Sequence, residues 1–505
     1  MKYWLGIDIG TGGSRALLVG AGGEVVAGVT AVHNDIAMAH PLWAEQDPDN
    51  WWDAAVEAIQ GVLAKAGASG DDIAGIGFSG QMHGLVLLDE SDQVIRPALI
   101  WCDQRSQSQV DWINQTAGAD FVLEQTANPV LTGFTAPKLL WVRDHDKPSY
   151  ERTRKMLLPK DYVRFRLTGD YAGDVSDASG TALFDVVNRR WADPLIDKIG
   201  VDRSILPPVA ESQDVVGKVS EAGSAKTGLK AGTPVVAGAG DQAASAVGNG
   251  IVEPGLVSCT IGTSGVVFSH MDEVAYDPGG RVHTFCHAVP GKWHVMGVTQ
   301  GAGLSLHWFK NQLARDAVAR AAETRADPYD LLMDEAATAP AGSEGLFWLP
   351  YLMGERTPHL DATCRGGWIG MTAKHTRAHL IRSLIEGVSY SLKDCLSIVE
   401  SLGIEVSAVR ASGGGARSPF WRDVLAGVFN KPIATLQTQE GSAYGAALLA
   451  MVGSGQFASV GEACAATITE QSRTAPEASL ARVYGEGHGV FRDLYPPLKP
   501  LFPRM

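Results

Sequence analysis

The sequence predicts an α/β protein in which one layered unit occurs twice. Residues 2–32 contain three apolar segments separated by the glycine-rich turns 10–13 and 20–23, which predicts a meander of three antiparallel strands. Apolar residues at helical spacing over 51–66 and a buried strand over 73–78 follow. Three antiparallel strands, a helix and a further strand in this order are typical of α/β layers.

The second half of the chain repeats this theme. Residues 234–240 predict a strand that ends in glycines, residues 256–261 a second strand, and residues 266–268 its antiparallel return. The turn 262–265, GTSG, is similar to GTGG at 10–13. This similarity suggests a duplicated fold with two hairpins that face phosphate.

The same pass along the chain indicates its domain organisation. Helical patterns over 302–332 and 384–402 belong to the second half. The stretch 217–232 is rich in Gly, Ala and Lys, and we expect it to be the passage between domains. Residues 1–232 and 233–505 are therefore expected to form two domains.

Composition limits the classes of partner. The 505 residues are 45% hydrophobic and 19% charged, which is ordinary for a globular protein. The formal net charge of -14 and the absence of a Lys/Arg run argue against nucleic-acid binding. ATP remains possible, because main-chain N–H groups and a metal ion can bind phosphate on an acidic protein.

Cysteines and apolar runs indicate the compartment. The six cysteines include no CxxC pair, so neither a zinc site nor a disulfide framework is expected, and scattered thiols fit the cytosol. No apolar run reaches transmembrane length, and the N-terminus lacks the apolar region of a signal peptide. We expect a cytoplasmic protein without membrane contact.

The first motif that can carry chemistry is GIDIGTGGSR at 6–15. A glycine-rich hairpin exposes main-chain N–H groups that can bind phosphate, and Thr11 and Ser14 add hydroxyl donors. Arg15 can neutralise charge on the transferred group, and Asp8 is placed to hold Mg²⁺ through water. A tight hairpin closed by Asp8 explains the same residues equally well.

The second motif is GAGDQAA at 238–244. A carboxylate after a glycine-rich strand end can accept the proton of an attacking hydroxyl, which is the task of a kinase base. With an ordinary pKa of about 4, Asp241 would be ionised at neutral pH. Its alternative role is a helix N-cap, and the two roles can coexist.

The third motif is VRASGGGARSPFW at 409–421. It predicts a strand, a triple-glycine turn and a helix capped at Ser418 with Pro419 at its first position. The helix N-terminus is an anion site, and the glycines would let a nucleotide lie against the main chain. A P-loop is excluded, since GxxxxGK[ST] does not occur.

The fourth motif is SGQMHG at 79–84, after a buried strand. Gln81 and His83 offer neutral donors and acceptors suited to a polyhydroxy ligand, and Met82 can pack on its carbon face. A single His at a strand end is more often structural. The segment WCDQR at 101–105 can line a sugar pocket or close a turn with an ion pair.

Together these motifs resemble the FGGY carbohydrate kinases, and within them the xylulokinases. The matching segments follow in order at 6–11, 79–84, 158–164, 174–181, 240–242, 261–265, 349–359 and 413–418. Two longer segments resemble the signatures of the family, GFTAPKLLWVRDH at 133–145 and GGWIGMTAKHTRAHLIRSLIE at 366–386. The resemblance therefore spans nearly the whole chain.

The resemblance implies two ribonuclease-H-like domains, related to actin and hexokinase, with an active-site cleft between them. It implies Mg·ATP as the donor, the C5 hydroxyl of D-xylulose as the acceptor and Asp241 as the catalytic base. The metal would lie at Asp8 and Asp241. The expected sugar-binding residues are Gln81, Met82, His83, Asp241 and Gln242. The expected ATP-binding residues are Thr11, Ser14, Arg15, Thr263, Gly303, Gly414, Gly415 and Ser418.

Differences within the family bear on the sugar. Glycerol kinases carry an Arg–Glu pair where this chain has Gln81-Met-His83, which favours xylulose over glycerol. Xylulokinases often have Asn where this chain has Cys102, and some have Asn in place of Gln242. Arg15 resembles the glycerol-kinase hairpin more than the Lys of some xylulokinases, and the two cations are not equivalent.

Three alternatives stay open. One is an FGGY kinase for another ketose or polyol, such as L-xylulose, ribulose or xylitol. Another is an ATP-binding chaperone or cytoskeletal relative with the same fold. A sugar sensor would need a DNA-binding segment, and the chain shows none. Homodimers are frequent in the family, although no residue here establishes one.

Overall fold

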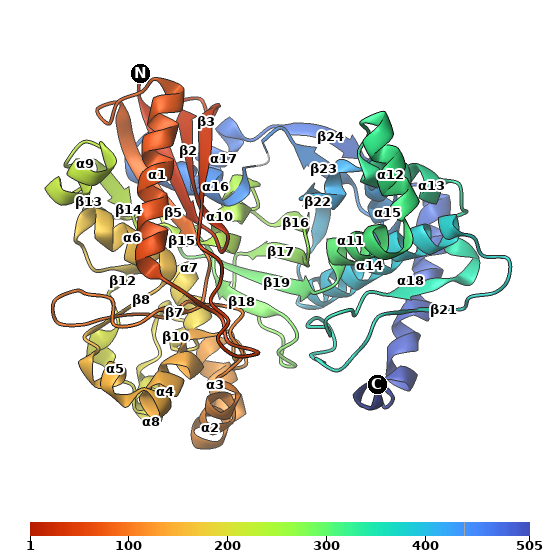
Figure 1. The fold of residues 1–505 in the computed structure, drawn as a ribbon, viewed down its shortest axis with the longest axis horizontal. Coiled ribbons are helices and arrows are strands. Elements are labelled where there is room, and N and C mark those ends of the chain that lie inside the picture. The colour runs from red at the N-terminus through yellow and green to blue at the C-terminus, as the bar shows by residue number, and fades with distance from the viewer. Residues whose placement is uncertain (439) are drawn as a thin grey trace.

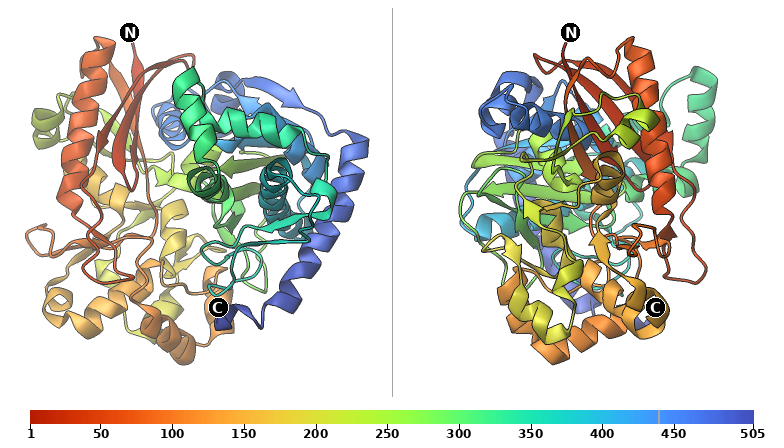
Figure 2. Two further views of the ribbon diagram at one scale, coloured as in Figure 1. Left: turned by 45° about the vertical axis from the view of Figure 1, so that its right-hand side comes forward. Right: turned by 90° about the vertical axis from the view of Figure 1, so that its left-hand side faces the viewer.

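The computed structural model describes residues 1–438 and 440–505. Two seven-stranded sheets dominate it, one in each half of the molecule, with helices on their faces (Figure 1). In Figure 2, α1 lies on the outside of the first half and α18 runs along the outer edge of the second. None of the helices in the described part of the chain is both long and apolar enough to span a membrane.

The first sheet begins with the predicted meander. Strands β1 (Tyr3–Ile9), β2 (Gly13–Gly20) and β3 (Val25–Val32) pair antiparallel in sequence order. On its other side β1 pairs parallel with β5 (Ile73–Gly80). Successive side chains of a strand point to opposite faces of the sheet, and both faces of this sheet are buried. The two faces belong to different apolar clusters, one around Leu5, Ile7 and α1 and the other around Trp4 and α16.

Helix α1 (Pro48–Ala66) covers the first of these faces. The carboxylate of Asp47 accepts a hydrogen bond from the N–H of Asp49 at 3.0 Å, and Pro48 occupies the first turn. The helix ends at Gly67, whose φ of 63° suits glycine. The expectation of a helix here is confirmed.

The edge of the first sheet corrects the expected interdomain passage. Strands β13 (Val215–Lys218), β14 (Pro234–Val236) and β15 (Ala239–Gly240) all belong to this sheet, and helix α9 (Glu221–Thr227) lies between the first two. The stretch 217–232 is therefore internal to the first half. Its Gly, Ala and Lys residues reflect an edge helix and its turns. The sheet continues past the boundary expected between 232 and 233.

The second sheet repeats the topology of the first, as the similar turns suggested. Strand β16 pairs antiparallel with β17 and parallel with β22, just as β1 pairs with β2 and β5. Its strands are β16 (Gly255–Ile261), β17 (Gly265–Met271), β18 (His283–Cys286), β19 (Trp293–Thr299), β22 (Val406–Ser412), β23 (Ile433–Leu436) and β24 (Glu470–Thr474). The core of this half lies between the sheet and helices of the second half.

Two helices stack on the second face of the first sheet. Helix α10 (Asp241–Gly248) packs on α16 (Gly441–Gly453), and α16 packs on the second face of the first sheet. Glycines permit these approaches, since a Cβ on Gly6 would lie 1.9 Å from the carbonyl oxygen of Ala443. A Cβ on Gly445 would lie 1.8 Å from that of Ala244. A helix from late in the chain is thus part of the first half.

The remaining elements surround these layers. The helices of 107–227 besides α9 are α2 (Gln107–Ala117), α3 (Ala119–Thr126), α4 (Thr135–His145), α5 (Lys147–Arg152), α6 (Pro159–Thr168), α7 (Val175–Ala178) and α8 (Asp193–Ile199). Later helices are α11 (Ala302–Leu313), α12 (Arg315–Thr324), α13 (Pro328–Ala337), α14 (Arg377–Ser401), α15 (Pro419–Phe429), α17 (Val460–Thr467) and α18 (Ala478–Leu498). The short strands are β4 (Glu45–Gln46), β6 (Val86–Leu88), β7 (Ala98–Leu99), β8 (Lys155–Leu157), β9 (Gly173–Asp174), β10 (Phe184–Asp185), β11 (Arg190–Trp191), β12 (Val209–Ala210), β20 (Phe347–Leu349) and β21 (Gly367–Ile369).

Candidate active site

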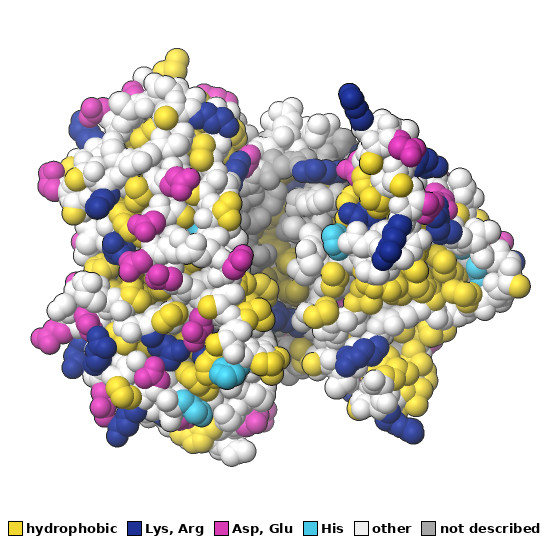
Figure 3. All heavy atoms as spheres, viewed as in Figure 1, with side chains coloured by type: hydrophobic (Ala, Val, Ile, Leu, Met, Phe, Trp, Pro, Cys, Tyr) yellow, Lys and Arg dark blue, Asp and Glu magenta, His cyan; other side chains and the backbone are white. Residues whose placement is uncertain are grey.

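A deep hollow separates the two halves of the molecule (Figure 3). At the first sheet, neighbouring strands end side by side, because Ser79 of β5 stands in register with both Asp8 of β1 and Ala239 of β15. Asp241 follows directly after β15 and begins α10. The sheet register thus brings together two carboxyl groups that lie far apart in the sequence.

Asp8 affects the ionisation of Asp241. Removal from water and the charge of Asp8 together raise the pKa of Asp241 to about 7, although hydrogen bonds from Gln242 act in the opposite direction. Burial also raises the pKa of Asp8, although Ser79 Oγ donates to its carboxylate at 2.8 Å and Arg15 opposes the rise. The expectation of an ordinary pKa near 4 for Asp241 therefore does not hold.

This pair of carboxyl groups fits a magnesium ion. Mg²⁺ keeps several waters and is usually held by one or two carboxylates together with substrate phosphates. Asp8 and Asp241 supply such a set, and two negative charges at one place favour a divalent cation. No cluster of three or more His, Cys, Asp or Glu suited to a metal occurs among residues 1–438 and 440–505, so an all-protein cage is not present there.

The loop after β5 carries the expected sugar residues. Met82 is buried against the turn before Asp241, since a Cβ on Gly240 would lie 3.0 Å from Met82 Sδ. His83 lies 2.7 Å, through Nδ1, from the carbonyl oxygen of Gly180. Burial lowers the pKa of His83 to about 3, so the ring is neutral. A proton on Nδ1 that bonds this carbonyl leaves Nε2 as an acceptor.

Gln81 has a different environment from its two neighbours. Its side chain is buried and donates to Gln46 Oε1 at 3.1 Å, while its own Oε1 accepts from the Thr11 hydroxyl at 3.2 Å. These bonds connect the sugar loop to the first hairpin. Gln242, by contrast, keeps partial exposure beside Asp241. The structure therefore groups Met82, His83, Asp241 and Gln242, with Gln81 behind them.

The first hairpin separates its three expected ATP residues. Thr11 lies at the turn, where its hydroxyl also accepts a hydrogen bond from Trp101 Nε1 at 3.0 Å. Ser14 is fully buried toward α1, and its hydroxyl lies 2.8 Å from His33 Nε2. Its side chain therefore does not face phosphate, contrary to expectation. Adjacent strand residues point to opposite faces, so Ser14 and Arg15 could not both reach one ligand.

Arg15 is also occupied. Its guanidinium donates to both carboxylate oxygens of Glu440, at 2.7 and 2.8 Å, and to the hydroxyl of Thr30 at 2.9 Å. This ion pair ties the first hairpin to the start of α16. In the structure, Arg15 supports the hairpin and is not directed at a ligand as a free cation.

The second hairpin exposes Thr263 at its tip. Helix α11 supports the turn, because the N–H of Gly303 donates to Gly262 O at 2.8 Å and that of Leu304 donates to Thr263 O at 3.0 Å. A Cβ on Gly303 would lie 2.4 Å from Gly262 O, so only glycine fits. Gly303 thus contacts the turn itself.

The triple-glycine turn lies beside a cavity lined by Asn249, Ala411 to Gly413, Ala416, Arg417, Thr435, Leu436 and Thr438. Gly414 is exposed, and a Cβ there would meet nothing within 4 Å. A Cβ on Gly415 would lie 2.5 Å from Ile261 Cγ2. The Ser418 hydroxyl accepts from Trp421 N at 3.3 Å and caps α15, as predicted. This leaves the main chain of the turn to approach a ligand.

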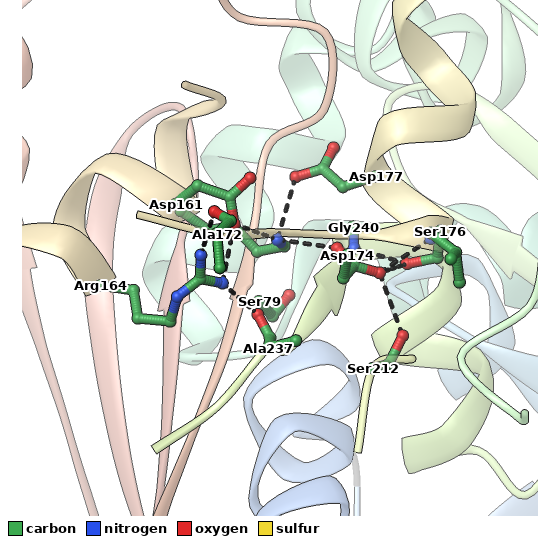
Figure 4. Close-up of polar contacts among 12 residues, drawn as sticks. Ser79, Asp161, Arg164, Ala172, Asp174, Ser176, Asp177, Ser212, Ala237 and Gly240 are labelled. Carbon is green, nitrogen blue, oxygen red and sulfur yellow. Dashed lines mark hydrogen bonds and ion pairs between the residues drawn. The ribbon is translucent and has the colours of Figure 1, made fainter. Parts of the chain in front are cut away.

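A buried ionic cluster behind Asp241 carried no assigned role in the sequence. Figure 4 shows its polar contacts among α6, α7 and the strand ends. Lys160 is fully buried, and its Nζ lies 2.6 Å from Asp161 and 2.7 Å from Asp174. Asp177 lies 3.5 Å from the same nitrogen, and both its oxygens are buried without a hydrogen bond.

This cluster binds the turn that precedes Asp241. Arg164 donates to Ala237 O at 2.6 Å and to Asp161 at 2.9 Å. The N–H of Gly240 donates at 3.1 Å to Ser176 Oγ, which in turn donates to Asp174 at 2.6 Å. The signal was present in LPKDYVRFRLTG, where three of the four charged residues, Lys160, Asp161 and Arg164, are buried in the helix. Sequence alone could not show that they pair with 174–177.

Comparisons with known proteins show the family of the chain. Residues 3–248 match the N-terminal domain and residues 257–454 the C-terminal domain of the FGGY family of carbohydrate kinases. Xylulose kinase of Bacillus subtilis is 38% identical over 99% of this chain and 98% of its own. Xylulose kinase of Escherichia coli is 37% identical over 99% of each chain.

Solved structures show the same architecture over the full length. A "xyloylose kinase" from Brucella ovis has a TM-score of 0.90 at 36% identity and covers 99% of this chain and 100% of its own. Xylulose kinase from Lactobacillus acidophilus has a TM-score of 0.93 at 27% identity, with 100% of each chain covered. This chain belongs to the FGGY family of carbohydrate kinases.

Proposed function

We propose that this chain transfers the γ-phosphoryl group of ATP to the C5 hydroxyl of D-xylulose, giving D-xylulose 5-phosphate and ADP. As an FGGY carbohydrate kinase it uses ATP and a sugar. The observation that carries the proposal is the position of Asp241, which lies beside Asp8 and behind the Met82–His83 loop. The relatives named xylulose kinase support the choice of sugar.

Asp241 is proposed as the general base. Its carboxylate accepts the proton of the sugar hydroxyl while that oxygen attacks the γ-phosphorus, and ADP leaves on the opposite side. The base must be ionised to do so. Met82 would pack on the carbon face of the sugar, and neutral His83 would accept a hydroxyl hydrogen bond at Nε2.

Most of the rate would come from positioning and neutralised charge. Mg²⁺, when bound, would be held at Asp8 and Asp241 and would neutralise charge on the transferred phosphoryl group. Thr11 and Thr263, at the tips of the two hairpins, and the main chain at Gly414 and Gly415 are proposed to bind ATP. Ser14, Arg15, Gly303 and Ser418 would support these segments, through the contacts described above.

The first test measures ADP release with Mg·ATP in the presence of D-xylulose. Parallel reactions contain D-ribulose, L-xylulose, xylitol, glycerol or D-gluconate, the last because gluconokinase of Bacillus subtilis is 29% identical. Stimulation by D-xylulose far above the other compounds is the expected result. Preference for another compound would overturn the substrate, and sugar-independent hydrolysis alone would overturn the sugar kinase function.

Location and assembly are further proposals. All six cysteines are free and five are buried, which fits a reducing cytoplasm. A homodimer stays a prediction, which sedimentation of the purified chain would test.

A further inference from the structure

The loop that carries Met82 and His83 is held from behind by helix α4. His83 has a φ of 69°, in the left-handed region that residues other than glycine rarely adopt. Its carbonyl oxygen accepts two hydrogen bonds, from Lys138 Nζ at 3.0 Å and from the Thr135 hydroxyl at 3.1 Å. Such a conformation persists where the surroundings enforce it, and these two donors are part of those surroundings.

Lys138 is an unusual residue in this position. It is fully buried, yet no carboxylate within the described residues lies in ion-pair range of its ammonium group. Its second hydrogen bond runs to another carbonyl oxygen, that of Gly133, at 2.6 Å. Burial lowers the pKa of Lys138 to about 7. An apolar side chain of similar length would fill the same space without this desolvation penalty. What the ammonium group provides in addition is the pair of hydrogen bonds to the two carbonyl oxygens.

The ring of His83 is fixed as firmly as its carbonyl group. It stacks on Phe134 with centroids 4.7 Å apart and planes 16° apart, and Nδ1 lies 2.7 Å from Gly180 O. A Cβ on Gly180 would lie 2.6 Å from the ring, which leaves no room for displacement on that side. Met82 precedes this peptide and contacts the Gly240 turn. A change in the His83 peptide would therefore move both sugar residues relative to Asp241.

We propose that Lys138, assisted by Thr135, is a positioning residue that holds the His83 peptide in its left-handed conformation and thereby sets the affinity and selectivity for the sugar. The proposal rests on the proposed sugar-kinase function. Lys138 does not touch the sugar in this scheme and acts through His83. The segments proposed to bind ATP lie on other elements. Gln81 connects the loop to Thr11, but Lys138 and Thr135 hydrogen-bond the carbonyl oxygen of His83, so we expect their effect to be on the sugar.

Lys138→Met keeps the length of the side chain and removes the ammonium group. We expect kcat/KM for the preferred sugar to fall by roughly 10², the scale of a misplacement of about 1 Å, with KM for ATP and sugar-independent hydrolysis unchanged. Discrimination against xylitol and glycerol should narrow. Thr135→Val should show a smaller change of the same kind, and Thr135→Ser, which keeps the hydroxyl, should restore wild-type values.

Lys431→Met is the control, because Lys431 Nζ donates to the carbonyl oxygen of Val406 at 2.7 Å, at the start of β22, and lies 3.6 Å from Glu400. It should leave both KM values unchanged. A folded Lys138→Met enzyme with wild-type sugar kinetics, or with an equal rise in KM for ATP, would overturn the proposal. If that variant does not fold, the same kinetic measurements comparing Thr135→Val with Thr135→Ser test the proposal.

A crystal structure of Lys138→Met, or of Thr135→Val if the first does not fold, separates this proposal from the proposed function. In the variant structure, the φ of His83 should leave the left-handed region. An unchanged φ would overturn the proposed positioning role of Lys138, whichever sugar is the substrate. Failure of the wild-type enzyme in the substrate panel would overturn the function and leave this structural result intact.

Discussion

At the scale of single residues, the closeness of Asp8 and Asp241 has a consequence for the pH dependence of catalysis. Asp241 works as a base when ionised, and its pKa is raised to about 7 by burial and by Asp8. We therefore expect kcat/KM for D-xylulose to fall about tenfold per pH unit below about pH 7 and to be level above it. A profile that stays level down to about pH 5 would show that Asp241 is already ionised there, as an ordinary carboxylate is and as bound Mg²⁺ would favour.

Replacing the base tests its role directly. Asp241→Asn keeps the size of the side chain and most of its hydrogen bonds but cannot accept the proton. Turnover should fall roughly 10²- to 10⁴-fold, while calorimetry still detects D-xylulose binding. Asp53→Asn, on the exposed face of α1, is the control and should keep wild-type turnover. Near-normal turnover of the first variant would remove Asp241 from the role of base.

At the scale of elements, the turn from β15 into α10 depends on the buried cluster around Lys160. Lys160→Met leaves Asp174 buried without its cation and Asp161 with Arg164 alone. Urea unfolding should show a loss of about 3–5 kcal/mol, the usual effect of breaking a buried ion pair by removing one partner.

The exposed pair of Lys230 and Asp71, 3.0 Å apart, supplies the control. Lys230→Met should change the free energy of unfolding by no more than about 1 kcal/mol, since exposed ion pairs contribute little. Equal effects of Lys160→Met and Lys230→Met would mean that the cluster does not stabilise the fold as its contacts suggest.

Elements defined by local signals were predictable from the sequence. The meander, α1 and the similar turns at 10–13 and 262–265 follow from alternation, caps and glycines, which are properties of neighbouring residues. The prediction of an interdomain passage at 217–232 was wrong, because an edge helix with glycine turns has the same composition as a linker. Composition does not tell which sheet a strand joins.

The candidate site divides in the same way. Asp8 lies at the end of β1 next to the glycine turn, and Met82, His83 and Asp241 follow strands that end in glycine, which sequence motifs indicate. The sequence could not show that the Ser14 hydroxyl points toward His33, because its direction depends on which helix covers which side of the sheet. The partners of Lys138 and Lys160 come from distant segments, and no local pattern predicts them.

At the scale of the whole molecule, the packing of α16 explains why segments far apart in the sequence meet around Asp241. Strand β1 and helix α16 lie at opposite ends of the chain, yet Gly6 allows them to touch. Arg15 and Glu440 join the same two regions beside the first hairpin. The hydroxyl of Ser442 also donates to Asp241 O at 3.0 Å. Asp241 is therefore supported by residues from late in the chain as well as by the strands of the first sheet.

Three buried histidines in the second half lead us to expect that the fold loses stability in acid. His270 and His294 form a cross-strand pair of β17 and β19, and the ring of His287 lies 5.2 Å from that of His270 and 5.7 Å from that of His294. Burial lowers the pKa of all three, that of His294 to about 3. The unfolded chain, with histidine pKa values near 6.5, binds more protons below that pH. Stability is therefore fully present above about pH 6.5 and falls as the pH drops.

His294→Phe isolates this effect. His294 is fully buried and stacks on Phe268 with centroids 4.3 Å apart, so Phe fits this apolar site. Below about pH 6, the free energy of unfolding of the wild type should fall by about 1.4 kcal/mol more per pH unit than that of the variant. This difference is the contribution of one histidine. The exposed His307 on α11 provides the control, since His307→Gln should leave the slope unchanged. Equal slopes for His294→Phe and the wild type would mean that other groups, such as the buried carboxyls, set the acid limit.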